Sequence, residues 1–125
     1  MVILISGYSL VDEKYTVIGC YFSAPYPKIS LPKLRDPFSF IFFSDPESSS
    51  GFSKFLSNPD CAEHLWISDT SLEVGGGGLV LNGPGSTVDC SLPTDSYLGE
   101  RKNIVFSHTV KIDRIRILQL NFELD

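Results

Sequence analysis

The chain has 125 residues, 42% of them hydrophobic and 20% charged, so it is long enough for one domain with a buried core and is neither collagen-like nor disordered in composition. Its 10 basic and 15 acidic residues give a net charge of -5, which argues against nucleic acid as a partner because phosphate backbones attract basic surfaces. The 10 Gly, 8 Pro, 9 Phe and 5 Tyr favour strands and turns over helices.

The first half of the chain predicts three strands. Runs of apolar, β-branched and aromatic residues at 2–6 and 16–23 predict a hairpin. The segment 24–37 contains four prolines, which remove backbone donors and predict a loop. Residues 38–44 carry Phe or Ile on both faces, which predicts a central strand covered on both sides. After the next turn, residues 52–56 have room for at most one helical turn.

The second half of the chain predicts further strands separated by turns. Residues 62–68 and 79–82 predict strands on either side of a run of four glycines. From residue 104 to the end the pattern is again typical of strands, with slips of the apolar phase near Asp113 and Leu118 that predict a bulge or a break. We therefore expect a single domain over residues 1–125, mainly β, folded as an antiparallel two-sheet β-sandwich with at most one or two short helices.

The sequence shows neither a clear targeting segment nor a cysteine pattern typical of disulfide bonds. The start of the chain has a short apolar run without a basic leader, and no apolar run approaches the length of about 20 residues that a membrane span requires. The three cysteines, Cys20, Cys61 and Cys90, are odd in number and widely separated, which is not typical of a disulfide framework. We expect free thiols in a cytoplasmic protein without membrane insertion.

The glycine run at 75–78 is the most conspicuous motif. Gly78 and Gly83 have the spacing of the two glycines of a phosphate loop, but Pro84 and Gly85 stand where that loop requires Lys and Ser or Thr. We predict that the run serves backbone geometry, through positive φ angles or close approach of strands.

No other motif predicts an active site, a metal or a cofactor. Cys61 and His64 form one Cys-x-x-His arm, but no second pair at similar spacing completes a zinc site. Cys90 lies in a turn-flanked segment where Asp89 would disfavour the thiolate. Trp66 is expected to anchor the core or a sheet face. A thiol or serine hydrolase remains an alternative because either histidine could lie near a nucleophile in the fold.

The order of the segments resembles the TLDc domain of the oxidation-resistance and nuclear-receptor-coactivator-like proteins. The resemblance rests on an aromatic strand with a Gly, a Phe-rich strand, a strand that leads through a glycine cluster into an aliphatic strand, a Gly-Ser-x-x-Cys-like segment and a closing strand. These blocks lie at 18–26, 38–44, 66–82, 86–90 with 96–98, and 106–120. Two features depart from the family pattern: the family's N-terminal helical portion is not seen, so the domain is expected to be a shortened version, and Arg116 stands where the family usually has Glu.

The resemblance implies a non-catalytic protein-interaction module linked to oxidative-stress resistance, with subunits of the vacuolar-type proton pump as the protein partner. It implies a cytoplasmic location, or one at the periphery of vacuolar or lysosomal membranes or of mitochondria. Because loops on a rigid sandwich commonly carry function, we expect the acidic and glycine-rich segment to bind the partner. The predicted contact residues are Asp69, Glu73, Gly75, Gly76, Gly77 and Gly78. A β-sandwich domain that recognises another protein is the alternative.

Overall fold

The computed structural model describes residues 1–23, 33–61, 63–67, 71–75, 77–82, 87–99 and 104–118. This part of the chain is all β and contains no helix, and so holds no helix of a length and hydropathy that would cross a membrane. The strands are β1 (Val2–Ser9), β2 (Tyr15–Tyr21), β3 (Lys33–Leu34), β4 (Phe40–Ser44), β5 (Phe52–Ser57), β6 (Leu65–Ile67), β7 (Ser71–Val74), β8 (Leu79–Asn82), β9 (Thr87–Leu92), β10 (Tyr97–Gly99) and β11 (Phe106–Leu118).

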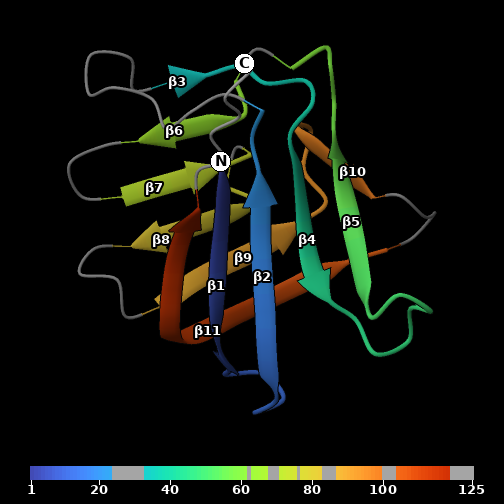
Figure 1. The fold of residues 1–125 in the computed structure, drawn as a ribbon, viewed down its shortest axis with the longest axis vertical. Coiled ribbons are helices and arrows are strands. Elements are labelled where there is room, and N and C mark those ends of the chain that lie inside the picture. Colours follow the sequence, from blue (N-terminus) through green and yellow to red (C-terminus); the bar gives the residue numbers. More distant parts are fainter. Residues whose placement is uncertain are drawn as a thin grey trace, which may run out of the picture.

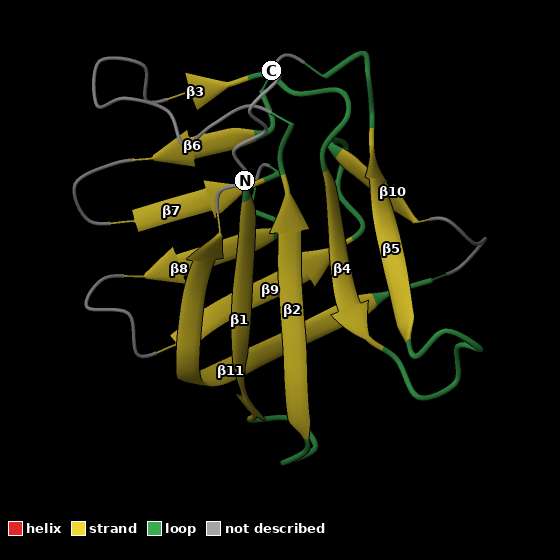
Figure 2. Cartoon of the chain, in the orientation of Figure 1, coloured by secondary structure: helices red, strands yellow, loops and turns green. Residues whose placement is uncertain are grey.

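The described strands form one antiparallel sheet in the order β10-β5-β4-β2-β1-β11-β9-β8-β7-β6-β3 (Figure 1). The long strand β11 joins its two halves, because residues 106–111 pair with β9 and residues 110–118 pair with β1. In Figure 2, strands β1, β2, β4 and β5 of the first half run across strands β6 to β9 of the second. The all-β antiparallel prediction is confirmed, whereas the expected two-sheet sandwich is not, since β11 makes the sheet continuous.

A bulge in β11 allows this bend. Ser6 pairs with Arg114 and Gly7 with Ile112, so Asp113 is left between them without a partner on β1. A Cβ atom on Gly7 would lie 2.0 Å from the carbonyl oxygen of Lys111, so only glycine fits the close approach of the two strands. The phase slip predicted near Asp113 is confirmed as this bulge.

The core lies between the two halves of the curled sheet. Inward-facing side chains alternate along each strand, and Ile3, Ile5 and Ile18 are each at most 1% exposed. The ring of Phe43 on β4 lies 4.4 Å from that of Phe106 on β11, which joins the two halves. Burial of this apolar surface is the main term that stabilises the fold.

Two local predictions are wrong. Residues 52–56 belong to strand β5, because outward Phe52, Lys54 and Leu56 alternate with inward side chains, which is the period of a strand. Strand β4 is central but is not covered on both sides: its outer aromatic side chains are only half-buried, by one another. Of the predicted loop at 24–37, residues 33–34 form β3, and residues 24–32 lie outside the described residues.

Candidate functional site

A chemically distinctive surface lies on the outer side of the first half of the sheet. Paired residues on neighbouring antiparallel strands point to the same side, so the register arranges these side chains in rows. We call this surface the outer face. Its residues are Val2, Leu4, Ser6, Tyr8, Tyr15, Val17, Gly19, Tyr21, Phe40, Phe42, Ser44, Phe52, Lys54, Leu56, Leu98, Lys111, Arg114, Arg116 and Leu118.

One row of the outer face is apolar across its whole width. The register aligns Leu98, Leu56, Phe40, Tyr21, Val2 and Leu118 on β10, β5, β4, β2, β1 and β11. Leu56 is 48% exposed and Leu98 is 49% exposed, although both are large apolar side chains. A contiguous apolar surface of this kind is typical of a binding site.

Aromatic contacts give the outer face a defined shape. The rings of Tyr21 and Phe40 stack with centroids 5.2 Å apart, and Phe42 lies 6.1 Å from both Phe40 and Phe52. The ring of Phe42 occupies the space beside Gly19, where a Cβ atom would come within 2.1 Å of ring atom Cζ. The Phe42 ring thus fills the space that a side chain at position 19 would occupy. The aromatic side chains of the outer face hold one another in place.

The charge of the outer face is opposite to that of the whole chain. Among its described residues are four cationic side chains, Lys54, Lys111, Arg114 and Arg116, and no acidic one, whereas the chain carries a net charge of -5. Lys54 Nζ lies 5.1 Å from the centroid of the Phe40 ring, within the range of a cation–π contact. The outer face is therefore aromatic at its centre and basic along two sides.

The second half of the sheet presents a different surface. Its outward row contains Trp66, Glu73, Val80, Asp89 and Thr109, and the Thr109 hydroxyl donates to Asp89 at 2.9 Å. Trp66 is 47% exposed, so it anchors a sheet face and not the core. Glu73 and Asp89 thus lie on the half of the sheet that lacks the aromatic cluster.

The predicted contact residues that the structure describes lie in this second half. Asp69 and Gly76 lie outside the described residues. Glu73 and Gly75 line a recess of about 340 Å³ that also contains Trp66 and Cys61. The structure thus brings two of the predicted residues together, in a recess smaller than the cleft of about 870 Å³ beside the β1–β2 hairpin.

The glycines of this segment are explained by backbone geometry, as predicted. Gly75 has φ of 71° and Gly77 has φ of 94°, a region that other residues rarely adopt. A Cβ atom on Gly75 would lie 2.3 Å from the Tyr97 ring, and one on Gly78 would lie 2.8 Å from Leu92. These contacts tie the described part of the glycine turn to the core.

His64 is a structural residue. It is 1% exposed, its Nδ1 accepts from the Asp36 backbone N–H at 2.9 Å, and its Nε2–H donates to the Asn58 carbonyl at 3.1 Å. Both ring nitrogens are therefore occupied, and Cys61 Sγ instead contacts the Ser96 hydroxyl at 2.9 Å. The described residues contain no group of three or more side chains placed to hold a metal.

The three cysteines are free, as predicted, and two of them are inaccessible. Burial raises the pKa of the Cys20 thiol to about 12. Burial, with a smaller effect of the neighbouring Asp89 carboxylate, raises the pKa of Cys90 to about 12 as well. Neither thiol is suited to nucleophilic chemistry near neutral pH, because the thiolate is the reactive form.

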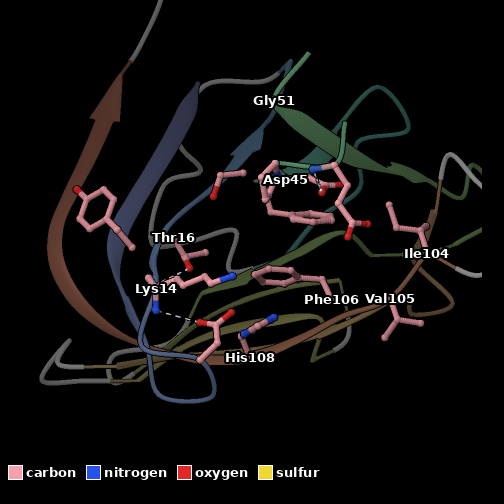
Figure 3. A pocket seen from close by; sticks show the side chains of 14 residues that line it. Lys14, Thr16, Asp45, Gly51, Ile104, Val105, Phe106 and His108 are labelled. Carbon is pink, nitrogen blue, oxygen red and sulfur yellow. Dashed lines mark hydrogen bonds between the residues drawn. The ribbon is translucent and has the colours of Figure 1, made fainter. Parts of the chain in front are cut away.

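A cleft of about 870 Å³ opens between the β1–β2 hairpin, the β4–β5 hairpin and the start of β11. Figure 3 shows Asp45 across this cleft from Phe106 and His108. His108 Nδ1 lies 2.8 Å from the hydroxyl of Ser9, which also accepts from the Val11 N–H at 3.1 Å. Because Ser9 is 1% exposed, its hydroxyl fixes the hairpin and does not face a substrate.

Comparisons of the chain with protein-family models, with curated proteins and with solved structures gave no match. The TLDc resemblance therefore stays a prediction, and the case for function rests on the surfaces described above. The sequence analysis missed the outer face, although a signal exists. On the side away from the core, β1 has Val2 and Leu4, β4 has Phe40 and Phe42, and β5 has Phe52 and Leu56, in addition to the apolar residues on the core side.

Proposed function

We propose that this chain is a non-catalytic protein-interaction module that binds its partner through the outer face. One observation carries the proposal: a row of apolar side chains crosses six paired strands and remains accessible, with Leu56 and Leu98 about half exposed. Protein interfaces are enriched in aromatic residues and Arg at the positions that contribute most to affinity, and the outer face contains both.

The TLDc resemblance supplies a first partner to test, the peripheral subunits of the vacuolar-type proton pump, and a setting in oxidative-stress resistance. In this proposal the two halves of the curled sheet take the place of the two sheets of the TLDc sandwich. The outer face replaces the glycine-rich segment as the expected contact surface, because its apolar row crosses six paired strands and lies beside cationic side chains.

Affinity capture from a eukaryotic lysate tests the proposal. The test variant is Phe52→Ser with Leu56→Ser, two exposed outer-face side chains. The matched control is Trp66→Ser, which removes an equally exposed aromatic ring from the second half of the sheet. We expect pump subunits to co-purify with the wild type and the control and to be lost with the double variant.

Capture of a different protein with the same dependence would support the interaction module with another partner. Capture that the double variant leaves unchanged, or that Trp66→Ser removes, would place the binding surface elsewhere. Far-ultraviolet circular dichroism of all three proteins checks that the substitutions leave the fold intact.

A further inference from the structure

We propose that the outer face binds an acidic amphipathic helix of a partner protein. This inference rests on the proposed function and names the chemistry of the partner. The secondary structure of the partner follows from the pairing of the strands. Strands β5, β4, β2 and β1 each have a hydrogen-bonded neighbour on both sides, so a segment that lies across these four strands meets side chains and no free strand edge. A segment that lies on it must satisfy its own backbone groups, as a helix does.

The dimensions of the apolar row fit a helix of ordinary length. The row from Leu98 to Leu118 crosses six strands, and neighbouring strands are about 4.8 Å apart, so it is about 24 Å long. At a rise of about 1.5 Å per residue, this corresponds to about 16 helical residues, or four to five turns. An apolar stripe at every third or fourth position of such a helix would lie along the row.

The charges beside the apolar row specify an acidic partner. The adjacent row begins with Lys54 on β5, passes through Phe42, Gly19 and Leu4, and ends with Arg116 on β11. Arg114 and Lys111 continue the basic side along β11. Glu or Asp residues that flank the apolar stripe of a helix would meet these cations, which favours that orientation and excludes basic helices.

The same charges argue against a second copy of the chain packed face to face. Such a dimer would bring the cations of two outer faces together, and like charges across an interface are unfavourable. An anionic membrane surface would also be attracted to these cations, but it has no apolar stripe that would match the apolar row of the outer face. We therefore choose the helix and use the membrane as an outcome of the test.

The test uses synthetic peptides of 16 residues with blocked termini. The first carries a Leu stripe flanked by Glu, the second has Lys in place of every Glu, and the third is a scrambled form of the first without a stripe. Binding to the whole chain is followed by fluorescence anisotropy and by amide chemical shifts. We expect the first peptide to bind, with shifts confined to the outer face, and its affinity to fall as salt is raised.

Two variants test the charges. We expect Lys54→Glu with Arg116→Glu to weaken binding of the acidic peptide by about tenfold or more and to increase binding of the basic one. The control Glu73→Lys changes a charge on the second half of the sheet and should leave the affinity unchanged within about twofold. Equal binding of the three peptides, or no effect of the charge reversal, would overturn the inference.

A parallel measurement uses vesicles of phosphatidylserine and phosphatidylcholine. Vesicle binding that depends on Lys54 and Arg116, together with no binding of the acidic peptide, would show that the outer face binds a lipid surface and not an acidic helix. A different result would reject the acidic helix while leaving the proposed protein-interaction function intact. If partners captured from the lysate depend on Phe52 and Leu56 but survive the charge reversal, the interaction module stands and the acidic helix does not.

Discussion

The ring of Phe42 lies against the backbone of Gly19, where a Cβ atom would come within 2.1 Å of Cζ. Phe42 also contacts the rings of Phe40 and Phe52, so the missing side chain at position 19 allows three aromatic rings to pack on one side of the sheet. The shape of the outer face thus depends on a glycine within strand β2.

We expect Gly19→Ala to lower the free energy of unfolding by about 1–3 kcal/mol, because the new methyl group displaces the Phe42 ring. Phe42→Ala in the same background should recover part of this loss, since it removes the clash. Urea unfolding of the two single variants and the double variant measures the coupling. Additive effects would show that the ring and the glycine are independent.

Gly7→Ala is the comparison for this experiment. Its Cβ atom would meet the backbone carbonyl of Lys111 at 2.0 Å, and truncating a side chain cannot relieve that contact. We expect a larger loss than for Gly19→Ala, with changed amide shifts around the bulge at Asp113. A loss no larger than that of Gly19→Ala would mean that β1 and β11 separate easily.

The extent to which the sequence predicts this fold differs between elements. The strands β1, β2 and β4 are predictable because their apolar residues alternate or cluster locally. Strand β5 was missed because it lies between Gly51 and Asn58, both typical of turns, and because Ser53 and Ser57 take inward positions where an apolar residue would mark a strand. The continuous sheet was missed because one long strand, β11, pairs with both β1 and β9, a contact over long sequence separation.

The outer face could be predicted only in fragments. Strands such as β4 show outward apolar residues in the sequence, but the row from Leu98 to Leu118 can be recognised only once the register across six strands is known. The partner-binding site was predicted at the glycine run because its residues are consecutive in the sequence. Its backbone geometry was correctly anticipated, whereas the dispersed cations of β5 and β11 gave no local motif.

His64 provides a test of the buried polar contacts. Replacement by Leu removes the acceptor for the Asp36 N–H and the donor to the Asn58 carbonyl, and leaves both backbone groups without these partners. We expect the free energy of unfolding to fall by about 2–4 kcal/mol. His108→Leu, which loses one hydrogen bond, to the Ser9 hydroxyl, at the half-buried edge of the cleft, should cost less. Urea unfolding measures the loss of stability in both variants. An equal loss in His64→Leu and His108→Leu would contradict a structural role specific to His64.

The accessibility of the thiols predicts their reactivity. Cys20 is fully buried and Cys90 is 4% exposed, whereas Cys61 is half-buried beside Ser96. We expect one alkylated cysteine, Cys61, after brief treatment of the native protein with iodoacetamide at pH 8, and three in urea. Mass spectrometry of tryptic peptides identifies the sites. Alkylation of Cys90 as fast as Cys61 would show that β9 opens readily.

The raised thiol pKa values also predict a loss of stability in alkali. The pKa of Cys90 is about 12 in the fold and 9.0 without it, so above pH 9 the unfolded chain binds fewer protons than the native one. The free energy of unfolding should then fall by about 1.4 kcal/mol per pH unit for this thiol until pH 12. Because burial likewise raises the pKa of Cys20 and Tyr97, the wild type should lose stability steeply. Cys90→Ala retains Cys20 and Tyr97. Urea unfolding between pH 9 and pH 12 should show that the free energy of unfolding of this variant falls less steeply with pH than that of the wild type, by the contribution of one thiol. The same dependence on pH in both proteins would mean that Cys90 is hydrated in the fold.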